Sequence, residues 1–198
     1  MKGIEGLHLR AGETVLVIGS GPIGIILGAL AKRAGTRVIA SDLFSERLAV
    51  AKSFGISEVI KAPSEDAVAR TRALTEGRGA DAVIVAVPGN NLVRTAIEAA
   101  RPGGRVMLFA HTARSEATID PAAICVDEKS LLGSYSASVD LQEEAVRLVF
   151  GGEIDCARLI SHRFPLGAAV EAIRLAANPL PDSMKIVISL NGQQGGSQ

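Results

Sequence analysis

The stretch Gly19-Ser-Gly-Pro-Ile-Gly24 constrains the fold of this chain more than any other feature, because of the segments on either side of it. Residues 14–18 are apolar and rich in β-branched side chains, so they predict a buried strand. Residues 25–34 carry a helical pattern, and residues 37–41 predict a second strand that leads directly into Asp42. A strand, a glycine turn, a helix and a strand predict the beginning of a parallel sheet.

If the turn binds the pyrophosphate of a dinucleotide, each of the three glycines has a structural role. Gly19 permits the tight turn, Gly21 lets the phosphates approach the backbone, and Gly24 lets the helix pack against the strand. The helix N-terminus offers unpaired N–H groups and the positive end of its dipole to the phosphates. The carboxylate of Asp42 is placed to accept hydrogen bonds from both hydroxyls of the adenine ribose.

A methyltransferase-like sheet is the alternative to this interpretation, because it also ends its second strand in an acidic residue. That class usually has its third glycine one position earlier, where this chain has Ile23. The position of Gly24 therefore favours dinucleotide binding.

Strand and helix patterns alternate along the rest of the chain, as is typical of a parallel sheet with helices on both faces. Strands are expected at residues 14–18, 37–41, 57–60, 81–87, 105–110, 130–136 and 184–190. Helices are expected at residues 25–34, 45–54, 64–76, 91–101, 141–150 and 166–177. We predict an α/β fold with a doubly wound parallel sheet (a Rossmann fold). It would form a single domain over residues 1–190 with a C-terminal helix and strand, followed by a flexible tail at 191–198.

Composition excludes several classes of function. The 21 basic and 21 acidic residues balance, and one Tyr with no Trp offers little for base stacking, which argues against nucleic acid as a partner. Residues 14–31 carry no charge, but their glycines favour a buried strand–turn–helix over a membrane span. The 2 cysteines and 3 histidines have no metal-ligand spacing. We expect a cytoplasmic protein that binds neither nucleic acid nor membrane and holds no metal in this chain.

Several stretches together carry a family resemblance, namely residues 11–24, 41–48, 101–104, 160–166 and 185–188. In that order they resemble the cofactor-binding half of the zinc-dependent medium-chain alcohol dehydrogenases, nearest to the sorbitol and threonine dehydrogenase branch. The resemblance implies NAD as the cofactor and hydride transfer between NAD and a secondary alcohol or ketone, such as a polyol or amino alcohol. It also implies a homodimer that pairs through the strand near residues 131–136.

In that family a separate N-terminal domain carries the zinc ligands, and no histidine or cysteine of this chain matches them. The resemblance therefore implies that the zinc domain is absent and that this chain alone binds cofactor with little turnover. We also expect the last strand, residues 184–190, to lack the sheet partner that it has in the family. Two other interpretations stay open: a stand-alone NAD-binding or sensing module, and a zinc-independent reductase of the quinone or enoyl type.

The predicted cofactor site comprises Gly19, Gly21, Pro22, Ile23, Gly24, Asp42, Leu43, Arg47, Val87, Ala110, His111 and Tyr135. Asp42 favours NAD, because the 2′-phosphate of NADP would face a like charge, although Arg47 stands close enough to be considered for that phosphate. Pro22 suits the first helical turn, where no N–H is lost. Lys185 is expected to anchor the terminal strand rather than to bind substrate. No catalytic residue and no metal ligand is assigned.

The nicotinamide end of the site is predicted from strand ends. Ile23 is expected to donate its backbone N–H to the pyrophosphate. Val87 ends the fourth strand at the carboxyl edge of the sheet, where open α/β sheets bind their ligands. The resemblance implies that backbone groups near Ala110, His111 and Tyr135 hold the nicotinamide carboxamide.

Overall fold

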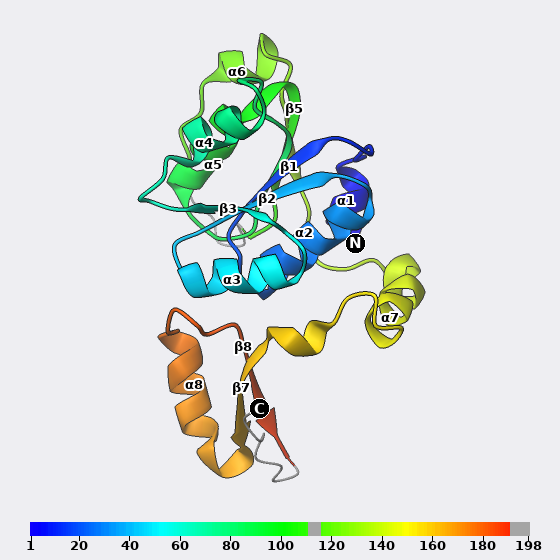
Figure 1. The fold of residues 1–198 in the computed structure, drawn as a ribbon, viewed down its shortest axis with the longest axis vertical. Coiled ribbons are helices and arrows are strands. Elements are labelled where there is room, and N and C mark those ends of the chain that lie inside the picture. The colour runs from blue at the N-terminus through cyan, green and yellow to red at the C-terminus, as the bar shows by residue number, and fades with distance from the viewer. Residues whose placement is uncertain (111–115, 191–198) are drawn as a thin grey trace.

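The computed structural model of the 198-residue chain describes residues 1–110 and 116–190. The strands of its main sheet are β1 (Thr14–Ile18), β2 (Arg37–Asp42), β3 (Glu58–Lys61), β4 (Ala80–Val85), β5 (Ala100–Leu108) and β6 (Ser130–Gly133). They pair in the order β3-β2-β1-β4-β5-β6, and every pair is parallel (Figure 1). The predicted doubly wound parallel sheet is confirmed.

Helices cover both faces of this sheet, because successive residues of each strand point to opposite sides. On one side lie α1 (Lys2–Gly6), α2 (Pro22–Arg33) and α3 (Ser45–Ser53), and on the other lie α4 (Ala67–Leu74), α5 (Asn90–Ala99) and α6 (Pro121–Cys125). Val15 and Val17 of β1 join the buried cluster of the first side, whereas Leu16 and Ile18 join that of the second. Such two-sided burial explains why the central strands are continuous apolar runs.

The strand order reverses at β1, and this reversal positions the site. β1 pairs with β2 on one side and with β4 on the other. The chain therefore leaves the carboxyl ends of β1 and β4 toward opposite faces of the sheet. Open α/β sheets bind their ligands in the crevice at such a point.

Beyond β6 the chain leaves the main sheet through η1 (Val139–Leu141) and α7 (Gln142–Phe150). Leu148 of α7 is buried against Leu30 of α2 and against Ile154. The remaining elements are η2 (Cys156–Leu159), β7 (Ile160–Pro165), η3 (Leu166–Ala168), α8 (Ala169–Ala177) and β8 (Lys185–Ser189). We call residues 156–189 the C-terminal unit, and Figure 1 shows β7, β8 and α8 below α3.

The last strand has a partner within this chain that the sequence analysis does not predict. β8 pairs in parallel with β7 in a second, two-stranded sheet, and α8 makes the crossover that a parallel pair requires. Sequence analysis gives no strand at residues 160–165, because the segment contains His162 and Arg163 and its side chains alternate between half-buried and exposed. A strand of this kind lacks the apolar run that marks the strands of the main sheet.

Short elements and one strand boundary also differ from the prediction. The sequence predicts a helix to residue 101 and a strand from residue 105, whereas α5 ends at Ala99 and β5 begins at Ala100. The register of β4 against β5 shifts between Ala80 and Ala82, which accommodates the glycine-containing start of β5. The sequence also omits α1 and α6, because helices of 5 residues are too short to show a periodic pattern.

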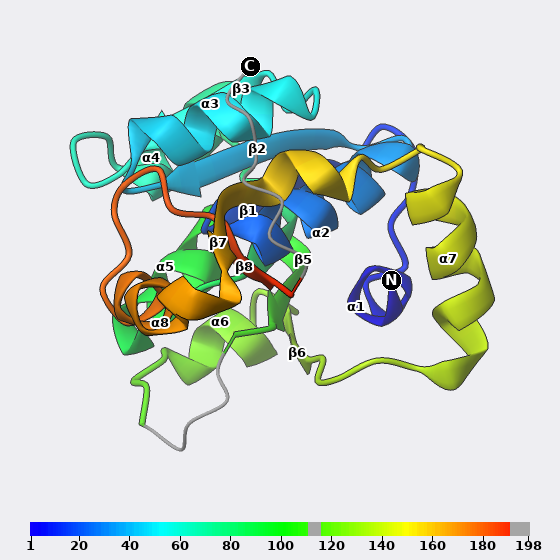
Figure 2. The ribbon, with the colours of Figure 1, turned by 90° about the horizontal axis from the view of Figure 1, so that it is seen from below.

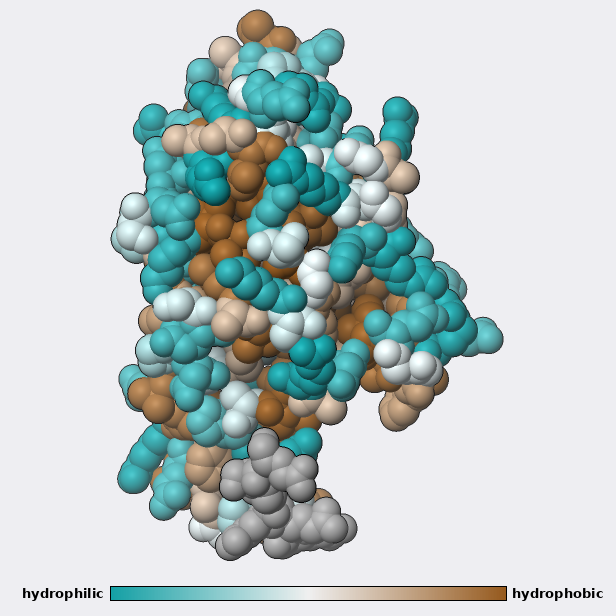
Figure 3. Space-filling model, viewed as in Figure 1, coloured by the Kyte–Doolittle hydropathy of each residue, from teal (hydrophilic) through white to brown (hydrophobic). Residues whose placement is uncertain are grey.

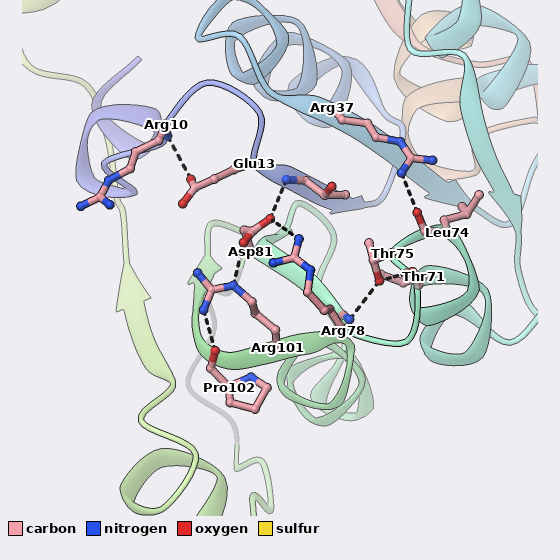
Figure 4. A network of polar contacts seen from close by, with 12 residues as sticks. Arg10, Glu13, Arg37, Thr71, Leu74, Thr75, Arg78, Asp81, Arg101 and Pro102 are labelled. Atoms are coloured by element: carbon pink, nitrogen blue, oxygen red, sulfur yellow. Dashed lines mark hydrogen bonds and ion pairs between the residues drawn. The ribbon is translucent and has the colours of Figure 1, made fainter.

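A polar network connects β1, β4 and β5 at the amino end of the sheet, opposite the carboxyl edge (Figure 4). The buried carboxylate of Asp81 accepts from the backbone N–H of Thr14 at 2.8 Å and from Nε of Arg101 at 2.6 Å, and it forms an ion pair with Arg78 at 3.5 Å. Burial alone would raise the pKa of Asp81, but these donors and cations together lower it below its ordinary value. The ionised carboxylate therefore stabilises the folded chain.

The C-terminal unit exposes apolar side chains on one side of α8. α8 buries Ala172 but leaves Val170 and Ile173 more than half exposed. Figure 3 shows apolar patches among the polar atoms of this lower part of the molecule. Within the described chain, α8 is therefore packed on one side only.

Candidate nucleotide-binding site

The glycine loop lies at the carboxyl end of β1, where the strand order reverses. Gly19 has a φ of +99°, and a Cβ there would collide with the side chain of Val87. A Cβ on Gly24 would collide with the carbonyl oxygen of Gly19, so the first turn of α2 packs directly on the loop. Apart from its chain neighbours, Gly21 has no described atom within 4 Å of the position that its Cβ would take, so the space beside it is open. The loop is therefore closed toward the sheet and open toward solvent.

The first turn of α2 presents unpaired donors beside this open space. Gly21 is the N-cap of α2, and because it has no side chain it cannot cap the helix with a hydrogen bond. Pro22 is the first residue of the helix, as predicted. The first i to i−4 hydrogen bond of the helix runs from the N–H of Ile25 to the carbonyl of Gly21 at 3.0 Å. The N–H groups of Ile23 and Gly24 precede that bond and have no helical partner. They are available to an anion at the helix N-terminus.

Asp42 joins the glycine loop to the second strand. Its side chain is 7% exposed, and Oδ2 accepts from the backbone N–H of Ser20 at 2.6 Å. Oδ1 accepts from the backbone N–H of Phe44 at 2.9 Å. The carboxylate therefore fixes the loop between β1 and α2 and the turn after β2. The sequence predicts the position of Asp42 but not its bond to Ser20.

A hollow of about 300 Å³ lies on the side of the loop nearest α3. It is bounded by Pro22 of α2 and Arg47 of α3 and by Ser183 and Lys185, among others, from the C-terminal unit. The guanidinium of Arg47 lies 4.9 Å from the ring centroid of Phe44, and its Nη2 donates to the carbonyl of Ser183 at 3.2 Å. Nε of Arg47 is buried and has no hydrogen-bond partner among the described residues. Two cations therefore border this hollow.

Lys185 is the site residue that sequence analysis assigns to another role. It begins β8, and it reaches the hollow only because β8 pairs with β7 beside α3. The sequence around a lysine at the start of a strand does not indicate that the lysine borders a binding site. Only the pairing of β7 with β8 places Lys185 beside the hollow.

A larger hollow, of about 540 Å³, lies on the other side of Ile23. Ile23, Phe109, Ala110, Ser134 and Tyr135 line it together with parts of α1 and α7, which lie near one another in Figure 2. The carbonyl of Tyr135 accepts from Nζ of Lys2 at 3.0 Å, and the Tyr135 side chain is 74% exposed. Oγ of Ser134 is buried without a partner in the described parts of the chain. The hollow can accept a flat ring with a small polar group.

The predicted site residues thus divide into groups around the glycine loop. Pro22 and Arg47 border the smaller hollow, and Ile23, Ala110 and Tyr135 border the larger one. Val87 packs against Gly19, and Leu43, 57% exposed, lines neither hollow. His111 lies outside the described residues, as does the predicted tail at 191–198.

Residues 1–110 and 116–190 present neither a metal-binding cluster nor a membrane-spanning helix. No group of three or more His, Cys, Asp or Glu side chains in these ranges could hold a metal ion. Cys125 and Cys156 are both free thiols. No helix of this part of the chain is long and apolar enough to cross a membrane.

Comparison with known proteins agrees with this geometry. A family model described as a zinc-binding dehydrogenase matches residues 22–151. The (R,R)-butanediol dehydrogenase of Neisseria gonorrhoeae is 29% identical over 184 residues, which cover 92% of this chain and 51% of that protein. A probable D-xylulose reductase A of Emericella nidulans is 37% identical over 159 residues, which cover 78% of this chain and 44% of that protein.

A solved structure shows the same architecture. The alcohol dehydrogenase TADH from Thermus sp. ATN1 superposes with a TM-score of 0.85 at 28% identity, covering 94% of this chain and 54% of that one. The chain therefore spans about half the length of the relatives that it matches.

Proposed function

Because this chain belongs to the zinc-binding dehydrogenase family, we propose that it is the NAD-binding half of an oxidoreductase that moves a hydride between NAD and a secondary alcohol. The names of two relatives, a butanediol dehydrogenase and a xylulose reductase, support a polyol or similar alcohol as the substrate class. The observation that carries the proposal is the buried carboxylate of Asp42, bonded to the glycine loop between two hollows.

The residues around the loop fit an extended dinucleotide. The pyrophosphate would lie beside Gly21, where no side chain intrudes and the first N–H groups of α2 are unpaired. The unpartnered Nε of Arg47 and the ammonium of Lys185 supply donors on the adenosine side. The hollow beyond Ile23 would receive the nicotinamide ring, which supplies the hydride chemistry when bound.

The cofactor is NAD rather than NADP in this proposal. Asp42 is ionisable, buried and adjacent to the place of the adenine ribose, so a 2′-phosphate would meet its negative charge at short range. Arg47 is not free to move its charge toward a 2′-phosphate, because its guanidinium lies over Phe44 and donates a hydrogen bond to the carbonyl of Ser183. Ribose hydroxyls, in contrast, donate to a carboxylate.

Zinc does not fit the described part of this chain, since no set of suitable side chains converges there. We assign the metal that the family name implies to the half of the longer relatives that this chain does not match. The exposed apolar side of α8 and the second edge of β8 are where that half would pack. No metal step is assigned to residues of this chain.

We further propose that the protein is a homodimer and lies in the cytoplasm. β6 is the last strand of the main sheet, and its outer edge has no strand partner among the described residues. Two copies could pair these edges about a two-fold axis. Two free thiols are compatible with a reducing compartment.

Calorimetric titration with NADH and NADPH tests the cofactor assignment. We expect NADH to bind the wild-type chain at least about tenfold more tightly than NADPH, and Asp42→Asn to narrow this ratio by about tenfold, equivalent to 1.4 kcal/mol. Asp120→Asn makes the same chemical change at the N-cap of α6 and is the matched control. Failure of the wild-type chain to bind either nucleotide would contradict the proposed function.

A further inference from the structure

Two arginines connect the C-terminal unit to opposite ends of α3, one from α3 and one from the unit. Arg47, in the first turn of α3, lies over the ring of Phe44 and donates to the carbonyl of Ser183 at 3.2 Å. Arg158, from η2, lies 5.1 Å from the ring centroid of Phe54 and donates to the carbonyl of Ser53 at 3.0 Å. Each contact combines a cation–π interaction with a hydrogen bond to a backbone carbonyl.

The two contacts differ in what lies beside them. Arg47 borders the hollow assigned to the adenosine side of the dinucleotide, and its buried Nε is unpartnered in the described structure. Arg158 is exposed and borders a separate hollow formed by the ends of α2 and α3. Only Arg47 can therefore contact a nucleotide and the C-terminal unit at once.

The carbonyl that Arg47 contacts belongs to a rigid turn. Ser183 is 4% exposed, its N–H donates to the carbonyl of Leu180 at 2.9 Å, and its Oγ accepts from the N–H of Leu180 at 3.1 Å. Met184, the next residue, packs against the core of the main sheet, and Lys185 lines the same hollow as Arg47. A displacement of Ser183 would therefore also displace Lys185 from the hollow.

We propose that Arg47 is a positioning residue that couples dinucleotide binding to the docking of the C-terminal unit, an inference that rests on the proposed function. The hollow has one wall from α2 and α3 and one from residues 176–186 of the C-terminal unit, so it is complete only when the unit is docked. A ligand that needs both walls favours the docked state, and docking in turn raises the affinity for the ligand. Arg47 carries this coupling because one guanidinium serves both contacts.

Hydrogen exchange of the whole chain, followed by mass spectrometry with and without saturating NADH, tests the coupling. In the wild type we expect NADH to slow exchange in residues 179–189 by at least about fivefold, the lower end of ordinary coupling energies. Arg47→Lys keeps the positive charge beside the ligand but lacks the planar fork that serves two partners. This variant should bind NADH about fivefold more weakly in calorimetry, because the coupling is reciprocal, and at saturating NADH it should lose the slowing in residues 179–189.

Arg158→Lys is the matched control, because it weakens the other contact away from the hollow. Exchange without ligand should rise in both variants, and NADH should restore protection only in Arg158→Lys. If Arg47→Lys keeps the wild-type response to NADH, or if the wild type binds NADH without protecting residues 179–189, the coupling is overturned while the proposed function stands. If the wild type does not bind NADH, the proposed function and the coupling are both contradicted.

Discussion

The carboxylate of Asp42 acts on the protein before it acts on any ligand. Its two oxygens accept from Ser20 and Phe44, so the loop that would contact the pyrophosphate is held by the same group that would contact the ribose. An ionised carboxylate has about four lone-pair positions, so both bonds can persist when ribose hydroxyls are added. The binding surface is thereby organised in advance, which lowers the entropic cost of binding.

Two glycines of the loop should respond differently to the same added methyl group. Gly24→Ala places a Cβ against the carbonyl of Gly19, and we expect it to lower the free energy of unfolding by about 1–3 kcal/mol. Gly21 has extended backbone angles, φ −69° and ψ 179°, and open space around it. Gly21→Ala should change stability by less than about 0.5 kcal/mol but weaken NADH binding by about tenfold.

Urea unfolding and calorimetric titration of the two variants separate these effects. Equal losses of stability in Gly24→Ala and Gly21→Ala would contradict the assignment of Gly24 to packing and of Gly21 to the ligand.

At the scale of elements, the main sheet is predictable and the C-terminal unit is not. β1 and β4 are buried along their whole length, so apolar runs mark them in the sequence. β7 mixes His162 and Arg163 with half-buried residues, and its partner β8 follows only after α8. The glycine loop and Asp42 belong to the predictable part. Lys185 and the contact of Arg47 with Ser183 depend on a pairing that no local pattern reveals.

The Asp81 network, which connects three strands, predicts a pH dependence of stability. The pKa of Asp81 is lowered in the folded protein, so its contribution is complete above the unfolded value of about 4 and is lost as pH falls through the folded value. Asp81→Asn should lower the free energy of unfolding by about 2 kcal/mol at pH 7. Its stability should also fall less steeply below pH 5 than that of the wild type.

Urea unfolding at a series of pH values between 7 and 3 measures this difference. Asp182→Asn, at an exposed position, is the control. A pH profile of Asp81→Asn parallel to that of the wild type would exclude Asp81 as the source.

At the scale of the whole molecule, the chain presents two surfaces that suit further protein. One is the outer edge of β6, and the other is the half-covered C-terminal unit. The matched relatives are about twice as long as this chain, which supports the second surface as the contact with their additional half. The first surface is the one that we propose for a second copy.

A charge on the outer strand should prevent this pairing. Leu131 of β6 is 39% exposed, and Leu131→Lys adds a charge of the kind that protects open sheet edges. We expect the wild type to elute as a dimer and Leu131→Lys as a monomer in size-exclusion chromatography with light scattering. Val170→Lys, on exposed α8, should remain dimeric. A monomeric wild type at high protein concentration would contradict the dimer.

The central place of β1 in the sheet also affects the chain while it is being synthesised. Within this chain β1 is synthesised before β2, β3 and β4. β2 and β3 can pair beside it, but its other edge stays open until residues 82–85 of β4 have been made. During that interval the apolar run of residues 15–18 exposes one row of unpaired backbone groups, the condition that promotes aggregation of nascent chains. Synthesis of residues 43–85 therefore sets how long the nascent protein is exposed to this hazard.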